Sequence, residues 1–299
     1  MFPVVQELAD DGVPVAVTCR VLKVSTSGYY EWRTRPASSR DLEQAYLMNA
    51  IRDVHSASYG TYGHRRVHAE LTMGRRLAVS HGRVERLMRS TGLQGVHRRR
   101  LRGCTRRDEA ATPSDDLVER DFTPAAPDRL YVADVTQHRT GEGWLYCAVV
   151  IDCFSRRVVG WSIADHIRSE LVVDALQMAI WHRRPPAGAI HHSDHGSTYT
   201  SWAFGHRLRE AGLLGSMGSI GDCFDNSVAE SFFATLQTEL LDRSDWPTRE
   251  GLANAIFSFI EGFYNPRRRH STLGYLSPAD YETRWAHTSP AGPAAEDAA

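Results

Sequence analysis

Short apolar patterns with helical spacing fill the first ninety residues of the chain, and glycine and serine separate them. The spacing predicts helices over 15–21, 42–54, 64–71 and 82–90. The arginines of the last segment lie mostly away from its apolar face. Short helices, tight turns and an arginine-bearing last helix are typical of a helix-turn-helix module. A small helical bundle with a solvated basic face fits the same pattern, so both interpretations stay open.

The pattern of apolar positions changes after residue 129. Apolar, strand-like runs cover 130–136, 144–152 and 157–163, and a glycine turn joins the first two, which predicts an antiparallel meander. Beyond them, helices are expected over 170–181, 199–211, 227–241 and 249–264, and strands over 189–192 and 213–217. The order β-β-β-α-β-α-β-α predicts a mixed α/β layer fold.

The composition is that of a globular protein, with 42% hydrophobic and 24% charged residues among 299. At about 150 residues per domain, the length suggests two domains. No apolar run approaches the roughly 18 residues of a membrane-spanning helix, and the first residues do not resemble a secretory signal. The five cysteines are scattered without CxxC pairs, so we expect neither disulfides nor a zinc site. These features favour a reducing cytosol and no membrane partner.

The net charge of −1 hides an asymmetry along the chain. Residues 1–112 carry a net charge of +8, and residues 113–299 carry −9. A basic half indicates a polyanionic partner, most simply nucleic acid. The charge changes sign within 106–128, a segment rich in proline, aspartate, alanine and threonine that we interpret as an interdomain linker. The end of the chain, 286–299, is expected to be a disordered tail.

Three acidic residues occupy positions where a charge is costly. Asp134 lies inside an apolar strand, Asp194 follows a short strand, and Glu230 opens a helix. Charges at half-buried positions need a partner or a bound cation. Carboxylates from strand ends and one helix can hold two Mg²⁺ ions about 3.5–4 Å apart for phosphoryl transfer. Oxygen ligands without cysteine favour Mg²⁺ or Mn²⁺ over Zn²⁺.

Short motifs spread over most of the chain carry a family resemblance. They are SGYYEW at 27–32, YGTYGHRRV at 59–67, DVT at 134–136, GWLY at 143–146, IDCFSRRVVGW at 151–161, HSDHGS at 192–197, DN at 225–226, ESFF at 230–233, YN at 264–265, RH at 269–270, LGY at 273–275 and SP at 277–278. Between Asp194 and Glu230 lie 35 residues. With these motifs in this order, the chain resembles the catalytic subunit of retroviral-integrase-like insertion-sequence transposases, the OrfB-type subunit encoded by a second, frameshifted reading frame.

The resemblance implies an α/β fold: an RNase H-like core, which is a mixed five-stranded sheet with flanking helices, preceded by an all-α helix-turn-helix region. Asp134, Asp194 and Glu230 fall on the family's D-D-35-E positions, which implies a catalytic, metal-binding triad. The implied activity is DNA strand cleavage at the element's ends followed by strand transfer, with two Mg²⁺ ions per site and Mn²⁺ as a substitute. The expected domains are an N-terminal helical segment (1–40), a helix-turn-helix-like DNA-binding region (41–105), the linker (106–128), an integrase catalytic core (129–285) and the tail (286–299).

The resemblance also implies partners. They are the element's terminal repeats, target DNA, further copies of the chain in a synaptic complex, and an upstream-frame helix-turn-helix protein, separate or fused. A bacterial cytoplasmic location follows, with the protein on the nucleoid when it binds DNA. The expected DNA-contact residues are Arg65, Arg66, Arg83, Arg86, Arg98, Arg99, Arg100, His192, Gln237, Arg269 and His270. Gln237 stands where the family usually has a basic residue, and the loop 218–221 also lacks one.

Other interpretations of individual residues stay open. Asp152 is a rival first acid, although local pairing or a turn suits it better. Asp225 precedes a helix, where N-cap chemistry is the simpler interpretation. The histidines beside Asp194 are conceivable zinc ligands, but neighbouring side chains on a strand face opposite ways. We therefore favour a role near substrate phosphate for His192 or His195.

Two other functions compete with the transposase. A non-catalytic DNA-binding regulator, or a domesticated or inactive transposase, would keep the fold and need no working triad. An RNase H-type nuclease would share the fold and the metals, but it has no need of the basic N-terminal half. The basic run 267–270 follows the last predicted helix. It is expected either to stabilise the local structure or to contact a DNA phosphate.

Overall fold

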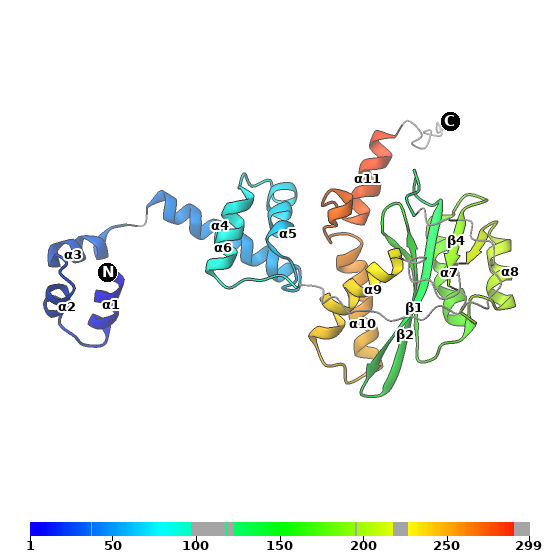
Figure 1. Cartoon of the computed structure of the whole chain (residues 1–299), viewed down its shortest axis with the longest axis horizontal. Coiled ribbons are helices and arrows are strands. Elements are labelled where there is room, and N and C mark those ends of the chain that lie inside the picture. Colours follow the sequence, from blue (N-terminus) through cyan, green and yellow to red (C-terminus); the bar gives the residue numbers. More distant parts are fainter. Residues whose placement is uncertain (37, 97–117, 119–121, 195, 218–226, 290–299) are drawn as a thin grey trace, which may run out of the picture. The chain divides into compact units, whose positions relative to one another are not determined.

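The computed structural model of the chain describes residues 1–36, 38–96, 118, 122–194, 196–217 and 227–289 (Figure 1). Internal contacts divide it into two units, residues 1–53 and residues 54–299. None of the described helices is long and apolar enough to cross a lipid bilayer.

The first unit is helical. It contains α1 (Phe2–Asp10), α2 (Val15–Val21), α3 (Thr26–Thr34) and most of α4 (Ser39–Ala57). Val5, Cys19 and Tyr29 form its small buried core, and the Tyr29 hydroxyl donates a 2.7 Å hydrogen bond to Gln6. The helix predicted over 15–21 is confirmed, whereas α1 was not anticipated because its short apolar pattern was considered only as a possible signal.

The second unit begins with two helices that pack on each other. They are α5 (His64–Ala69), which a π-helical turn η1 (Glu70–Gly74) continues, and α6 (His81–Ser90). The apolar residues at helical spacing, Val67 and Leu71 on one side and Val84 and Met88 on the other, are buried. Both predicted helices are confirmed, since their apolar stripes need each other for burial.

A five-stranded mixed sheet forms the centre of the second unit. Its strands are β1 (Leu130–Thr140), β2 (Gly143–Asp152), β3 (Val158–Ala164), β4 (Ile190–Ser193) and β5 (Leu214–Met217). The strand order is β3-β2-β1-β4-β5. The first three strands pair antiparallel, while β4 pairs parallel with β1 and β5 parallel with β4. The predicted meander and the mixed sheet are both confirmed.

Helices cover both sides of this sheet (Figure 1). The helices that contact the strands are α7 (Ser169–Arg183), α8 (Trp202–Glu210), α9 (Ser227–Glu239) and α10 (Arg249–Phe259). Further helical segments are η2 (Leu241–Arg243), η3 (Ile260–Tyr264), which continues α10, η4 (Ser271–Leu273) and α11 (Pro278–Thr288). The helix α11 was not predicted. Ser277 caps it by accepting a hydrogen bond from the Asp280 amide, and proline occupies its first position. Because α11 runs to Thr288, the first three residues of the predicted tail are helical; residues 290–299 lie outside the described part.

Successive side chains of β1 point to opposite faces of the sheet, and this decides which of them meet α7. Tyr131 and Ala133 belong to the buried cluster formed with α7, so the even-numbered positions of β1 face the other side of the sheet. On β3, a Cβ atom at Gly160 would lie 2.1 Å from the Ala175 carbonyl oxygen of α7. Glycine therefore permits the close approach of α7, and the opposite face is left to Asp134 and α9.

The final residues of the predicted linker pack on this core. Phe122 is buried, and its ring meets the His192 ring edge-on at 5.6 Å. Asp128 accepts a 2.6 Å hydrogen bond from Arg183, whose guanidinium also binds Glu282 of α11 at 2.9 Å. Ion pairs thus tie the chain just before β1 and the last helix to α7.

Candidate active site

The parallel pairing of β1 with β4 brings the first two acids of the triad together. Val132 lies opposite His192 in this ladder, and Asp134 and Asp194 each follow two residues later. Adjacent parallel strands run in register, so the two carboxylates occupy equivalent places at the carboxyl edge of β4. Asp134 is half-buried and accepts a hydrogen bond from the Val135 amide, whereas Asp194 is exposed and accepts one from the Gly196 amide.

The third acid comes from α9, which packs across β1 and β2. Glu230 is exposed in the first turn of that helix. The opposite side of the helix is apolar, and Phe232 and Leu236 are fully buried. The Phe232 ring meets the Tyr264 ring edge-on at 4.8 Å, a contact that fixes the rotation of α9 and so the side on which Glu230 stands.

Electrostatics link the three carboxylates. Burial, together with the charges of Asp194 and Glu230, raises the pKa of Asp134 from 3.8 to about 7, against the lowering effect of the Val135 amide. Like charges influence one another in this way only at short range. Among the described residues, however, the oxygens of the three acids do not all lie within 4.8 Å of one another. The donor set, three hard carboxylates with mutual repulsion to relieve, fits a divalent cation of the Mg²⁺ type.

Tyr199 is a neighbour of the triad that the sequence did not indicate. Its hydroxyl is buried and has no hydrogen-bond partner among the described residues. Burial is the main cause that raises the pKa of Tyr199 well above 10, and the charges of Asp134 and Asp194 add to it. The hydroxyl therefore stays protonated beside two carboxylates. Sequence patterns gave no signal for it, because an aromatic residue before a helix usually serves packing.

The far end of α9 is anchored by buried charges. Glu239 accepts hydrogen bonds from Arg268 at 2.6 and 2.8 Å and from Arg66 of α5 at 3.0 Å. Glu239 and Arg268 are 5% and 4% exposed, so these ion pairs are shielded from water. The same helix therefore carries Glu230 at one end and this three-residue cluster at the other. Sequence analysis singled out the arginines and missed the acid that binds them.

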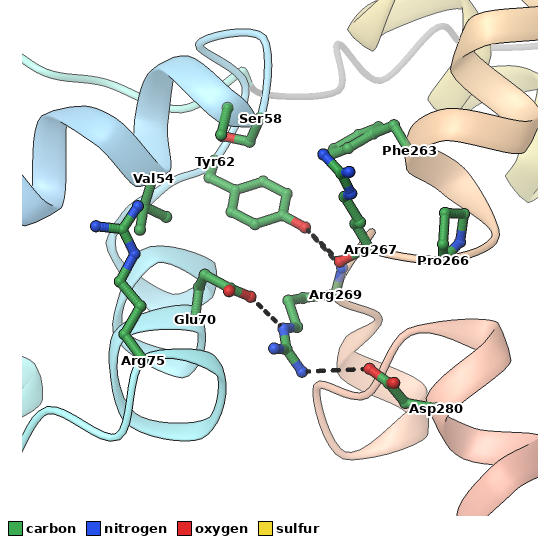
Figure 2. Close-up of a pocket in the computed structure, with 11 residues that line it drawn as sticks. Val54, Ser58, Tyr62, Glu70, Arg75, Phe263, Pro266, Arg267, Arg269 and Asp280 are labelled. Carbon is green, nitrogen blue, oxygen red and sulfur yellow. Dashed lines mark hydrogen bonds and ion pairs between the residues drawn. The ribbon is translucent and has the colours of Figure 1, made fainter.

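A second set of contacts joins the residues on either side of α5 to the C-terminal segment and surrounds a pocket of about 370 Å³ (Figure 2). The Tyr62 hydroxyl accepts a 2.7 Å hydrogen bond from the Arg269 amide and donates a longer one to the Arg267 carbonyl. The Arg269 guanidinium binds Glu70 at 2.7 Å and lies 3.9 Å from Asp280. Burial, the largest effect, raises the pKa of Tyr62 to about 12, so its hydroxyl keeps its proton.

Four of the residues expected to contact DNA have side chains that make contacts inside the protein. His192 is 1% exposed, and its Nδ1 is hydrogen-bonded to the Ser216 hydroxyl at 3.0 Å. Arg66 and Arg269 are bound to the carboxylates just described. His270 packs edge-on against Tyr264 at 5.0 Å, and burial lowers its pKa well below 6.5. For the run 267–270, the structural interpretation therefore holds at three of its positions.

Other expected contacts remain on the surface. Arg65 and Arg86 are exposed, and Arg83 is half-buried. Gln237 is half-buried and donates a hydrogen bond to Asp242. Arg98, Arg99 and Arg100 lie outside the described residues, as do His195, Asp225 and the loop 218–221.

Asp152, the rival acid, is a structural residue. It is 1% exposed and accepts hydrogen bonds from the amides of Asp128 and Ser155 at 2.6 and 2.9 Å. Burial raises its pKa to about 6. The interpretation as a local turn is confirmed. Asn265, which the sequence gave no role, bonds both backbone groups of Val158 and so joins the end of η3 to β3.

Comparison with known families assigns the helical region before the linker and the region that contains the sheet. Residues 124–223 and 212–278 match the family described as Integrase core domain, and residues 41–100 match the HTH-like domain. Fold and site thus define a protein that combines a helix-turn-helix-like region with an integrase-type catalytic core.

Curated relatives make the assignment more specific. The chain is 36% identical to transposase InsF for insertion sequence IS3A of Escherichia coli (strain K12), over 90% of this chain and 94% of that protein. It is 38% identical to the putative transposase for insertion sequence element IS986/IS6110 of Mycobacterium tuberculosis, over 88% and 96%. The chain belongs to the insertion-sequence transposases with an integrase core, which are polynucleotidyl transferases acting on DNA.

Solved structures with similarity to the chain include two retroviral ones. The HTLV-2 integrase catalytic core domain in complex with magnesium (trimeric form) has a TM-score of 0.41 and 17% identity, covering 53% of this chain and 98% of that chain. The simian T-cell lymphotropic virus intasome in complex with PP2A regulatory subunit B56 gamma has a TM-score of 0.45 and 14% identity, covering 83% and 78%.

Proposed function

We propose that the chain cuts DNA at the ends of its insertion sequence and joins the freed 3′ ends to a target, with Asp134, Asp194 and Glu230 as the catalytic residues. The observation that carries this proposal is the register of β1 with β4, which sets two carboxylates side by side. The effect of Glu230 on the pKa of Asp134 supports its place as the third member. The three acids would hold two Mg²⁺ ions, with Mn²⁺ as a substitute.

The cations, when bound, supply positive charge that favours attack of water or a 3′-hydroxyl on the phosphodiester. Because burial and the charges of Asp194 and Glu230 raise the pKa of Asp134 to about 7, part of the metal-free chains carry a proton on this carboxylate at neutral pH. It must release this proton when it becomes a ligand, so metal binding is expected to strengthen as the pH rises through 7. No side chain forms a covalent bond to DNA in this scheme.

The surface beside α9 suits a phosphate backbone. Ser227, Ser231 and Thr235 are spaced by four residues on α9, so they share one side of the helix. Together with Arg156 they line a pocket of about 280 Å³. Hydroxyl donors and an arginine are the groups that most often contact DNA phosphates. In this proposal, the DNA strand next to the scissile phosphate binds to this surface.

The helix-turn-helix-like region would bind the terminal repeats through Arg65, Arg83 and Arg86, with Arg98, Arg99 and Arg100 as further contacts. Gln237 would contact DNA without adding charge. Synapsis of two ends and a target requires several copies of the chain, and an upstream-frame helix-turn-helix protein, separate or fused, would add to end recognition. A protein that acts on chromosomal DNA would be located in the bacterial cytoplasm, at the nucleoid.

The test is a cleavage and joining assay on a labelled duplex that carries the element's end. The full chain, alone and fused to any upstream frame, is assayed with Mg²⁺ and with Mn²⁺. Asp134→Asn, Asp194→Asn and Glu230→Gln are expected to abolish nicking and joining while leaving DNA binding intact. Asp174→Asn is the matched control, because Asp174 is exposed on α7, on the side of the sheet away from Asp134.

Metal-dependent nicking that all three triad variants lose, and that Asp174→Asn keeps, supports the proposal. Binding of the duplex without cleavage under any of these conditions contradicts it and favours the non-catalytic regulator. Cleavage that survives in the Glu230→Gln variant contradicts the triad while leaving nuclease chemistry in place.

A further inference from the structure

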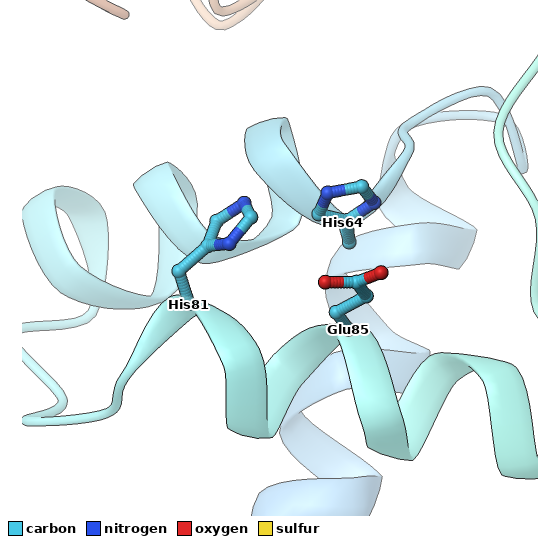
Figure 3. Close-up of side chains that lie close together, drawn as sticks. All are labelled: His64, His81 and Glu85. Atoms are coloured by element: carbon cyan, nitrogen blue, oxygen red, sulfur yellow. The ribbon is translucent and has the colours of Figure 1, made fainter.

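Two histidines and a glutamate come together on the helix-turn-helix-like region, far along the chain from the catalytic acids. His64 is the first residue of α5, and His81 and Glu85 lie on α6 (Figure 3). One ligand atom from each of the three lies within 4.8 Å of the other two. The rings of His64 and His81 meet edge-on, with centroids 4.6 Å apart.

Helical spacing explains why α6 supplies two of the groups. His81 and Glu85 are four residues apart, so they stand one turn apart on the same side of the helix. Packing of α5 against α6 brings His64 to face them. Among the described residues, no recorded hydrogen bond involves a ring nitrogen of His64 or His81, which leaves a lone pair on each ring for a ligand.

Glu85 can exchange its present partner, an arginine, for a metal ion. Glu85 accepts a 2.8 Å hydrogen bond from Arg89, whose side chain is 79% exposed. Such exposed pairs contribute little, so a cation can displace the arginine at small cost. A pocket of about 320 Å³ borders His64 and Glu85, and it leaves room for water as a further ligand.

We propose that His64, His81 and Glu85 bind a transition-metal ion of the Zn²⁺ class and that the ion clamps α6 to the start of α5. Two imidazoles and one carboxylate suit Zn²⁺, Co²⁺ or Ni²⁺, while Mg²⁺ prefers oxygen ligands alone. Three protein ligands and a water give the four-coordinate geometry that Zn²⁺ favours. The exposed Arg86 lies on the clamped helix, so the ion fixes the orientation of a side chain expected to meet DNA.

A neighbouring histidine supports the clamp. The Nε2 atom of His68, one turn after His64 on α5, lies 3.1 Å from the Val79 carbonyl, and its ring packs edge-on against His81 at 5.5 Å. These contacts hold the turn before α6 and limit the positions that the His81 ring can adopt. A metal ligand needs such a support to keep its orientation.

Co²⁺ is the probe for this site, because its visible absorption reports coordination. The full chain is titrated with Co²⁺ in excess Mg²⁺, which occupies carboxylate sites and competes poorly for imidazole. We expect one tight equivalent, displaced by Zn²⁺, and a rise in melting temperature on addition of Zn²⁺. His64→Ala and His81→Ala should lose this equivalent, and Glu85→Gln should weaken it by at least about tenfold.

The matched control is His206→Ala on α8. His206 and Glu210 form the same four-residue pair at 3.6 Å, and no third ligand joins them among the described residues. This variant should keep the tight equivalent. His81 is exposed, so its replacement is expected to leave the metal-free melting temperature unchanged. No tight Co²⁺ equivalent in the unmodified chain, or an unaltered one in the His81→Ala variant, would overturn the proposal. Failure here leaves the cleavage assay untouched, since that assay depends on Mg²⁺ at the triad.

Discussion

Arginine serves two different purposes in the two basic regions of this molecule. On α5 and α6, Arg65 and Arg86 extend into solvent and remain free for an external anion. In the C-terminal run, Arg268 and Arg269 are 4% and 7% exposed, and each binds a carboxylate. Burial and a matching acid, and not the density of positive charge in the sequence, decide whether an arginine is available to an external anion or holds the protein together.

The largest expected effect comes from removing the acid of the buried region. Glu239→Ala leaves Arg268 buried without its partner, and we expect a loss of about 3–5 kcal/mol in the free energy of unfolding. Urea denaturation measures it. Glu210→Ala, which breaks the half-exposed pair with Arg207, should cost no more than about 1 kcal/mol. Equal losses of unfolding free energy in the two variants would show that burial does not set the strength of these ion pairs.

His191 tests the role of burial in the opposite case, that of a buried titratable side chain without a partner. Burial lowers the pKa of His191 from 6.5 to about 4, and its ring nitrogens have no partner among the described residues. The native chain therefore binds fewer protons than the unfolded chain, and stability is lost as the pH falls from 6.5 to 4. His191→Leu should remove up to about 3 kcal/mol of this loss at pH 4. Parallel stability curves for the two proteins between pH 7 and pH 4 would contradict the assignment.

A pH dependence of similar size and opposite sign is expected at the triad. The pKa of Asp134 is raised to about 7, so in EDTA the native chain keeps a proton there that the unfolded chain loses near pH 4. Stability therefore falls as the pH rises from 4 to 7, and Asp134→Asn should melt higher than the unmodified chain at pH 8. At pH 4 the two melting temperatures should coincide. A lower melting temperature for the variant at pH 8 would show that the carboxylate is not destabilising.

The smallest effects on stability, and the clearest on binding, belong to the exposed region. Arg65→Ala and Arg86→Ala should each lower the slope of log binding constant against log salt by about 1, with unchanged melting temperature. Filter binding of a terminal-repeat duplex at several salt concentrations measures this slope. Arg209→Ala on α8, which is also exposed, is the control that should leave it as it is. A slope unchanged by the first two variants would move DNA binding away from α5 and α6.

Local patterns in the sequence were enough for most of the fold. Short apolar runs marked β1, β2 and β3, and helical spacing marked α2 and α5 to α10 within a few residues, because each such element buries apolar side chains. The helix α11 escaped prediction because its apolar pattern is weak and its place depends on Glu282 binding Arg183, 99 residues away in the chain. Asp152 was set aside as the first acid because local pairing or a turn suits it better, and its hydrogen bonds to the Asp128 and Ser155 amides agree with that choice.

The sequence by itself determined which residues are charged, which are apolar and how they are spaced, and so the class of fold and the three candidate acids. Only the tertiary structure decided which charges meet. Glu239 lies 29 residues before Arg268, and Glu70 lies 199 residues before Arg269. No local pattern encodes such pairs, because the free energy that favours them arises when distant segments exclude water together. The same holds for His64 and His81, whose nearness depends on α5 packing against α6.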